Sequence, residues 1–298
     1  MSEPANEDRV FLAIPHYGEI LPETLAAVCS CTQRRPPQIV TNGASLLAHN
    51  FNKLWCNALN DRKKNGLTHF AMLHADVMPD PLWLDTLIDE MRRVGADVIS
   101  CVVAIKDPRG LTSTGYQHPG TNNITRFTMA EVMALPETFD ASACPVASSI
   151  LMVNSAVWVC DFTKPWVEDV CFNIRDKIAK TDLGEFVPMV LSEDWNFSGW
   201  CAEKGLKVFA TRKVSVAHYG RIAFTTNKVW GELVTDVGDR PILREKPELN
   251  NGRCENHETA AASNGQRAGT SLPGAGGLPD QQGLEADRRP VLSGHAVD

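Results

Sequence analysis

Three short segments of this 298-residue chain contain the side-chain types that carry acid–base and metal chemistry in enzymes. In FAMLHADVMPDPLWL, an apolar run turns polar at His74, and Asp76 follows just before a Met-Pro turn. Glu193 and Asp194 stand side by side in a second segment, and His218 lies in the third, VAHYG. Whether these groups act together depends on the elements that position them.

The first 110 residues alternate between short apolar runs and amphipathic segments, a pattern that predicts alternating strands and helices. We expect strands at 9–15, 37–41, 69–73 and 96–103, and helices at 22–33, 45–66 and 81–95. Such alternation implies a mostly parallel sheet that is covered on both faces. The predicted fold class is therefore α/β, with a single Rossmann-like, mostly parallel sheet flanked by helices.

In an open sheet of this kind, ligands bind beyond the carboxyl ends of the strands. The residues at those ends are Pro15, His16, Tyr17 and Gly18, then Asn42 and Gly43, and then His74, Ala75 and Asp76. A carboxylate at position 76 would then point into the site and not into the core. The alternative is that Asp76 only caps the turn before PDPLWL, because Asp is common in such turns.

The second half of the chain is less regular. The turn-rich stretch 110–123 is expected to be a surface loop, 124–135 a strand running into a helix, and 146–158 a buried strand with its turn. Residues 191–210 are typical of a helix followed by a strand, and 213–220 of an alternating strand that ends on His218. The acidic pair at 193 and 194 then opens a helix, where carboxylates also stabilise the helix dipole without any catalytic role.

Composition argues against several classes of protein. A formal net charge of −7 argues against a general nucleic-acid binder. The polar, acidic start MSEPANEDRV does not resemble a signal peptide, and no apolar run approaches the roughly 20 residues of a transmembrane helix. Nine cysteines include no CxxC pair, which favours buried thiols in a reducing compartment over a zinc site. We expect a soluble, cytoplasmic protein.

The chain changes character near residue 245. No Phe, Trp or Tyr follows Trp230, and eight of the 21 glycines lie within 248–298. Such a segment cannot bury enough apolar area to offset its ordering entropy. We expect one domain over 1–245 and a disordered tail over 246–298.

The three segments, in this order, resemble motifs of the nucleotide-sugar-dependent glycosyltransferases of the A-type fold, in the large family-2-like group. MLHADVMPDP resembles their Asp-x-Asp strand end, SEDWNFSGWCAEKGLKVFA their Glu-Asp helix, and VAHYG their late histidine motif. The resemblance covers roughly residues 9 to 225. It implies a transferase that moves a sugar from a nucleoside-diphosphate sugar to an acceptor hydroxyl.

The resemblance also implies a divalent cation, Mn²⁺ or Mg²⁺, which stabilises the diphosphate as negative charge builds on it. In the family, the last acid of the Asp-x-Asp motif binds this metal, and in some members a late histidine does too. Those roles fall on Asp76 and His218. His74 stands where the family's first acid usually stands, and its neutral imidazole would hydrogen-bond a ribose hydroxyl instead. A structural role for either histidine is the alternative.

The family's remaining site positions can be carried over in the same way. Asp194 stands where inverting relatives place the base that takes the proton from the acceptor hydroxyl, with Glu193 beside it. The pair at 49 and 50 replaces an Arg-Asn pair that faces the donor, and Trp195 is the expected acceptor contact. The expected nucleotide-sugar contacts are Pro15, Tyr17, Gly18, Asn42, His49, Asn50, His74, Ala75 and Asp76.

Two other functions remain open at this point. Histidines at 74 and 49, in place of an acid and an arginine, favour a catalytically silent nucleotide- or carbohydrate-binding module on the same scaffold. A nucleotidyltransferase is disfavoured, because it should carry a glycine-rich, basic loop after the first strand. The segment IPHYGEILPE has one Gly and no Lys or Arg.

Overall fold

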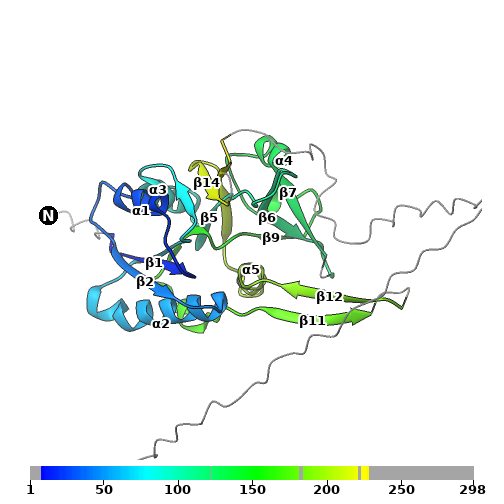
Figure 1. The fold of residues 1–298 in the computed structure, drawn as a ribbon, viewed down its shortest axis with the longest axis horizontal. Helices are drawn as coiled ribbons and strands as arrows, with labels where there is room; N and C mark the ends of the chain where they lie inside the picture. The colour runs from blue at the N-terminus through cyan, green and yellow to red at the C-terminus, as the bar shows by residue number, and fades with distance from the viewer. Residues whose placement is uncertain (1–7, 122, 181–183, 221–222, 228–298) are drawn as a thin grey trace, which may run out of the picture. The chain divides into compact units, whose positions relative to one another are not determined.

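The computed structural model describes residues 8–121, 123–180, 184–220 and 223–227 (Figure 1). The tail predicted at 246–298, and its boundary at 245, lie outside the described residues. None of the helices in the described part of the chain is long and apolar enough to cross a membrane.

Seven strands form the largest sheet, in the order β2-β1-β3-β10-β5-β13-β8. Their bounds are β1 (Val10–His16), β2 (Gln38–Gly43), β3 (His69–Leu73), β5 (Val98–Cys101), β8 (Thr138–Phe139), β10 (Val157–Asp161) and β13 (Val208–Thr211). The pairs β1–β2, β1–β3 and β5–β13 are parallel. Strand β10 lies antiparallel between β3 and β5, and β8 is antiparallel to β13. The sheet is therefore mixed.

Three smaller antiparallel sheets complete the described strands. One contains β4 (Val77–Pro79), β14 (Val216–Tyr219) and β15 (Ala223–Thr225). A second contains β6 (Leu111–Gln117), β7 (Ile124–Thr128) and β9 (Ile150–Met152). The third is the hairpin of β11 (Arg175–Lys180) and β12 (Phe186–Leu191), which extends away from α5 in Figure 1.

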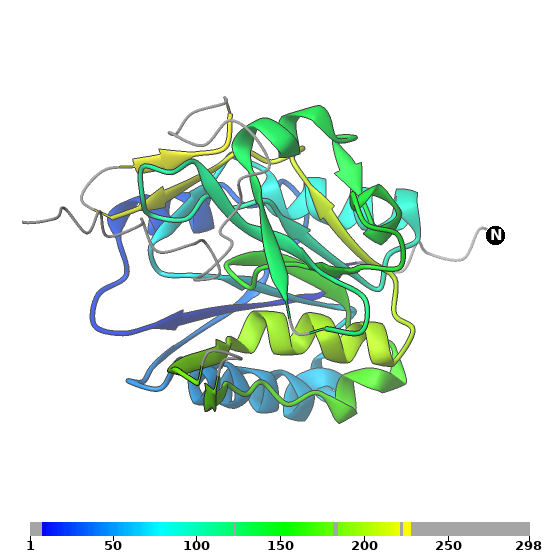
Figure 2. The same ribbon diagram turned by 90° about the vertical axis from the view of Figure 1, so that its right-hand side faces the viewer.

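Helices cover both faces of the seven-stranded sheet (Figure 2). They are α1 (Pro22–Cys29), α2 (Leu47–Asn65), α3 (Trp83–Val94), α4 (Met129–Ala134) and α5 (Glu193–Glu203), with short 3₁₀ helices η1 (Ala141–Ala143) and η2 (Pro165–Asp169). Side chains of α1 and α3 pack on one face, and those of α2 and α5 on the other. Gly66, at φ 62°, ends α2 as predicted, because a left-handed residue suits a helix C-terminus.

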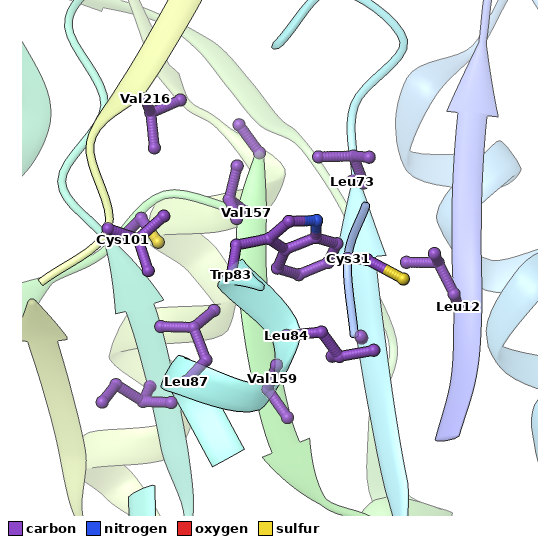
Figure 3. Packing of buried hydrophobic residues seen from close by; sticks show 14 of the residues in the cluster. Leu12, Cys31, Leu73, Trp83, Leu84, Leu87, Cys101, Val157, Val159 and Val216 are labelled. Carbon is purple, nitrogen blue, oxygen red and sulfur yellow. The ribbon is translucent and has the colours of Figure 1, made fainter. Parts of the chain in front are cut away.

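The two faces of β1 show why its run of apolar residues is continuous. Leu12 and Ile14 point into the cluster that contains α3, whereas Phe11 and Ala13 point into the cluster that contains α2. A strand that is buried on both faces has no polar positions to alternate with. Figure 3 shows the first cluster, in which Trp83 lies among side chains from several strands.

The prediction of a single, mostly parallel sheet flanked by helices is wrong. The described residues form four sheets, and only three strand pairs are parallel. The strand–helix alternation stops after β5. From there the strands are joined mostly by turns or short helices, and such connections favour antiparallel pairing. The run at 146–158 predicts one buried strand and its turn, but it contains β9 and only the first two residues of β10, which belong to different sheets. Nor does it indicate the direction in which β10 enters the large sheet.

The prediction of a surface loop at 110–123 is also wrong, because residues 111–117 form β6. Thr112 and Thr114 are fully buried there, so their small polar side chains replace the apolar ones that a strand usually shows. Gly115 lets β7 approach closely, since a Cβ atom at this position would lie 2.5 Å from the Thr125 carbonyl oxygen. Glycine and threonine here serve strand packing and not a turn.

Candidate functional site

Strand pairing brings the first and third chemistry-bearing segments together. Asp76 follows β3 and precedes β4, and β4 pairs antiparallel with β14, so that Val77 stands opposite His218. The backbone N–H of Tyr219 donates to the carbonyl oxygen of Asp76 at 2.8 Å. As a result, Nε2 of His218 lies 3.5 Å from Oδ2 of Asp76.

The other nitrogen of the His218 ring fixes what Nε2 presents to this carboxylate. Nδ1 lies 2.7 Å from the carbonyl oxygen of Ala104. A carbonyl oxygen only accepts, so Nδ1 carries the hydrogen and Nε2 of the neutral ring has a free lone pair. Metal-binding histidines are commonly held in this way by a backbone carbonyl. A lone pair that faces a carboxylate requires a cation, either a proton on Nε2 or a metal ion shared by both groups.

Lys106 supplies a third member that the sequence did not predict. Its Nζ lies 2.5 Å from Oδ2 of Asp76, the same oxygen that faces His218. The lysine and aspartate side chains are 38% and 36% exposed, so solvent screens this ion pair. Gly220 leaves room for the lysine, because a Cβ atom there would lie 3.3 Å from Cδ of Lys106.

The surroundings of Asp76 and His74 lower the pKa of both side chains, for different reasons. Burial of Asp76 would by itself raise the pKa of its carboxyl, but a hydrogen bond from His218, which requires a proton on Nε2, and another from the Lys106 ammonium outweigh burial and hold the pKa far below its ordinary value. Burial lowers the pKa of the His74 imidazole to about 4, although the Asp76 charge opposes this. At neutral pH the aspartate is therefore ionised and His74 is neutral.

His74 faces a different environment from His218. Its ring is tilted against that of Phe51, with centroids 5.3 Å apart. Its Nε2 lies 3.5 Å from Oγ of Ser155, a distance at the limit of a hydrogen bond. One side of the neutral ring therefore packs against Phe51, and its Nε2, held only weakly by Ser155, is able to form a stronger hydrogen bond with a ligand.

A metal ion fits the donor set at Asp76 and His218 only if other ligands complete it. In the described ranges there is no group of three or more His, Cys, Asp or Glu side chains that could hold a metal. One carboxylate and one imidazole leave most positions of a six-coordinate ion to water and phosphate oxygens. Mg²⁺ is often bound in this way, by one or two carboxylates together with the phosphates of a substrate.

The acidic pair begins α5, as the sequence predicted. Oδ1 of Asp194 accepts hydrogen bonds from the backbone N–H of Trp195 at 2.8 Å and from the Ser192 hydroxyl. Burial raises the pKa of Asp194, although these hydrogen bonds and the charge of Arg126 oppose the rise. Burial and the charge of Asp194 raise the pKa of Glu193. A carboxyl with a raised pKa is suited to accept a proton.

The segment before and along β6 connects Asp194 to the pair of Asp76 and His218. The indole Nε1 of Trp195 donates to the carbonyl oxygen of Ser113 at 3.3 Å. The backbone N–H of Ser113 donates to Val103 at 2.8 Å, and the next residue, Ala104, holds the ring of His218. The guanidinium of Arg126 lies 4.3 Å from the centre of the Trp195 ring. The same backbone segments, around Val103 and Ser113, therefore hold both Trp195, beside Asp194, and His218, beside Asp76.

A buried amide ties the ends of β1 and β2 together. Nδ2 of Asn50, which is fully buried, donates to the carbonyl oxygens of His16 at 3.2 Å and of Asn42 at 2.8 Å. Its Oδ1 accepts from Nδ2 of Asn42 at 2.7 Å. Asn50 thus bonds backbone groups of this chain in the structure and so positions the loop after β1. This loop contains Tyr17, whose side chain is 82% exposed.

The remaining residues predicted to contact the nucleotide sugar lie around this loop. Pro15 is buried at the end of β1 and stands opposite Asn42 in β2. Gly18 has φ 84°, which glycine adopts without strain, and its carbonyl oxygen lies 2.8 Å from Nδ1 of His16. His49 is exposed on α2, and Ala75 accepts a backbone hydrogen bond from Leu21.

Two cavities lie away from these residues. One, of about 320 Å³, is lined by Asp8, His69, Arg92 and others at the opposite ends of β1 and β3. The second, of about 480 Å³, lies between α5 and β9 and is lined by Ser198 and Phe209. Neither is lined by Asp76, so the chemistry-bearing residues do not coincide with these cavities.

Comparison with known proteins does not identify a family. No protein-family model matches the sequence, and no curated protein matches it. Among solved structures, the chain is similar to one described as the crystal structure of A197 from STIV. The two share 14% sequence identity with a TM-score of 0.44, and the match covers 76% of this chain and 95% of the other. A likeness this weak carries no argument about function.

Proposed function

We propose that this protein is a metal-dependent glycosyltransferase that moves a sugar from a nucleoside-diphosphate sugar to an acceptor hydroxyl. The observation that carries the proposal is the approach of Nε2 of His218 to Oδ2 of Asp76, at 3.5 Å. The Ala104 carbonyl turns the lone pair of that nitrogen toward the carboxylate. A divalent ion between the two groups would satisfy both.

In this proposal, Asp76 and His218 hold Mn²⁺ or Mg²⁺ together with oxygens of the donor diphosphate. When bound, the cation stabilises the negative charge of the leaving diphosphate as a Lewis acid. Lys106 lies on the same carboxylate and adds a second positive charge at this position. It is suited to turn toward a phosphate when a metal ion takes its place on Asp76.

Asp194 is proposed to take the proton from the acceptor hydroxyl. Its raised pKa and its tie to the backbone of Trp195 favour that role. Trp195 offers an aromatic face to an acceptor, with its indole N–H fixed on Ser113. On the donor side, Tyr17 is exposed enough to stack on a nucleobase, and His74 is neutral and suited to hydrogen-bond a ribose hydroxyl.

One observation favours a second function, a catalytically silent nucleotide-binding module. Lys106 lies on Asp76 and is long enough to turn from it toward a diphosphate, which would supply a positive charge there without any metal. Such a module would bind nucleoside diphosphates equally well with and without Mn²⁺. A transferase would need the cation for turnover.

Slow hydrolysis of nucleotide sugars tests the two functions. Common uridine and guanosine diphosphate sugars would be incubated with the full chain and Mn²⁺, and release of nucleoside diphosphate would be measured. We expect release from at least one donor, its loss on chelation of the metal, and a drop of at least about 100-fold in Asp76→Asn. Asp89→Asn is the matched control, because Asp89 is an exposed carboxylate on α3 that pairs with Arg34. Metal-independent binding without turnover would support the module and refute the transferase.

A further inference from the structure

The hairpin of β11 and β12 has no third strand among the described residues. Six cross-strand pairs join it, from Arg175–Leu191 at its base to Lys180–Phe186 near its tip. An isolated two-stranded hairpin is marginally stable in water unless a face of it is covered. In Figure 1 the two strands lie side by side and extend away from α5.

One face of this hairpin is apolar and exposed. Residues that stand opposite each other in an antiparallel pair share a face, so one face carries the pairs Asp176–Val190, Ile178–Pro188 and Lys180–Phe186. Its large apolar side chains are 78%, 73% and 65% exposed at Ile178, Phe186 and Val190. The opposite face, with Ala179, Val187, Met189 and Leu191, is half-buried apart from the exposed Lys177 and Arg175. Contiguous exposed apolar side chains of this kind mark interaction sites.

We propose that this exposed face pairs with the same face of a second copy of the chain. A two-fold axis that crosses the hairpin at the Ile178–Pro188 pair would place these two residues against their own copies. Asp176 would then face Lys180 of the other copy, and Val190 would face Phe186 of the other copy. Along β11 this face carries an acid, an apolar residue and a base, at 176, 178 and 180. Two copies that run in opposite directions therefore place each acid opposite a base.

The residues of the hairpin favour this occupant over two others. A peptide strand added along β12 would miss a hydrogen bond, because Pro188 has no backbone N–H. An anionic membrane surface attracts clusters of basic residues, whereas this face carries one base and one acid. Lys180 lies with its Nζ 5.7 Å from the centre of the Phe186 ring, so its charge is held over the apolar part of the face.

Sedimentation equilibrium on the full chain tests the pairing and does not depend on the proposed function. We expect a monomer–dimer equilibrium in the wild type at concentrations up to about 100 µM. Ile178→Asp should weaken the dimer at least about tenfold, because it places like charges on the axis. Leu25→Asp on α1 is the control, since Leu25 is a large apolar residue that is 49% exposed on another element.

A charge exchange separates this pairing from any other dimer. Asp176→Lys and Lys180→Asp should each weaken the dimer, because each places like charges opposite one another. The double variant should restore it, because the reversed order base, apolar, acid is again complementary to itself. Circular dichroism would confirm that each variant is folded. A monomeric wild type, a dimer indifferent to Ile178→Asp, or binding of this face to phosphatidylserine vesicles in its place would overturn the proposal.

Discussion

Replacing Lys106 by methionine should increase the affinity of the protein for Mn²⁺. The lysine ammonium lies on Oδ2 of Asp76, where the proposed metal ion must bind, so the two cations compete. Methionine keeps much of the length of the side chain and removes its charge. The variant therefore removes the competitor while the two proposed ligands, Asp76 and His218, stay in place.

The size of this effect follows from the exposure of the pair. Both side chains are more than a third exposed, so breaking the ion pair costs at most about 1 kcal/mol. A displaced ammonium about 8 Å from a divalent ion in water repels it by about 1 kcal/mol more. The sum of about 1 to 2 kcal/mol corresponds to an increase of about 5- to 30-fold in Mn²⁺ affinity.

Electron paramagnetic resonance of free Mn²⁺ would measure this affinity in a titration without any donor, so that no catalytic activity is needed. Lys164→Met is the matched control, because Lys164 pairs with Asp161, 3.6 Å away, at the other end of the sheet and its loss changes the net charge equally. Mn²⁺ affinity that stays the same or falls in Lys106→Met would refute the competition. A gain of equal size in Lys164→Met would assign the effect to net charge alone.

Three further predictions concern the same elements. Because burial raises the pKa of Asp194, the acidic limb of the profile of transfer rate against pH should lie above the ordinary value of 3.8, and a rate that stays constant down to that pH would exclude Asp194 as the base. Because the folded-state pKa of Asp76 is lowered, its stabilisation is present above the ordinary 3.8 and is lost as pH falls below it, so Asp76→Asn should reduce the free energy of unfolding by about 1 kcal/mol at pH 7 and by less at pH 3. A urea titration that shows an equal loss at both pH values would contradict this. Asn50→Ala should reduce the free energy of unfolding by about 2 to 3 kcal/mol, because the buried Asn50 amide is the donor shared by the ends of β1 and β2. Tyr17→Ala, at an exposed site, should reduce it by less than about 0.5 kcal/mol in the same titration.

Local patterns predicted the elements that carry the candidate site. Strand β3, helix α5 and strand β14 occur where their apolar runs and turn residues indicate, and so Asp76, Asp194 and His218 lie at the ends of elements or within a short strand. A metal ion shared by Asp76 and His218 requires these two side chains to lie close together, and the pairing of β4 with β14 brings them together. Each of these signals is short-range in sequence.

The parts that sequence reasoning missed are long-range. Nothing in residues 157–161 indicates that β10 enters between β3 and β5 in the opposite direction, because pairing depends on strands elsewhere in the chain. Lys106 lies in a turn-rich segment without periodicity, and its partner is 30 residues away. The hydrophobic pattern did not predict strand β6, because two of its buried residues, Thr112 and Thr114, are polar. Only the folded arrangement shows these contacts.

The most direct test of the metal site is anomalous diffraction from crystals grown with Mn²⁺ and a nucleoside diphosphate. The proposal predicts one manganese peak within about 2.5 Å of both a carboxylate oxygen of Asp76 and Nε2 of His218, in contact with diphosphate oxygens. Lys106 should then have left Asp76. A diphosphate bound with the lysine still on Asp76, and with no manganese peak beside His218, would contradict the proposed chemistry.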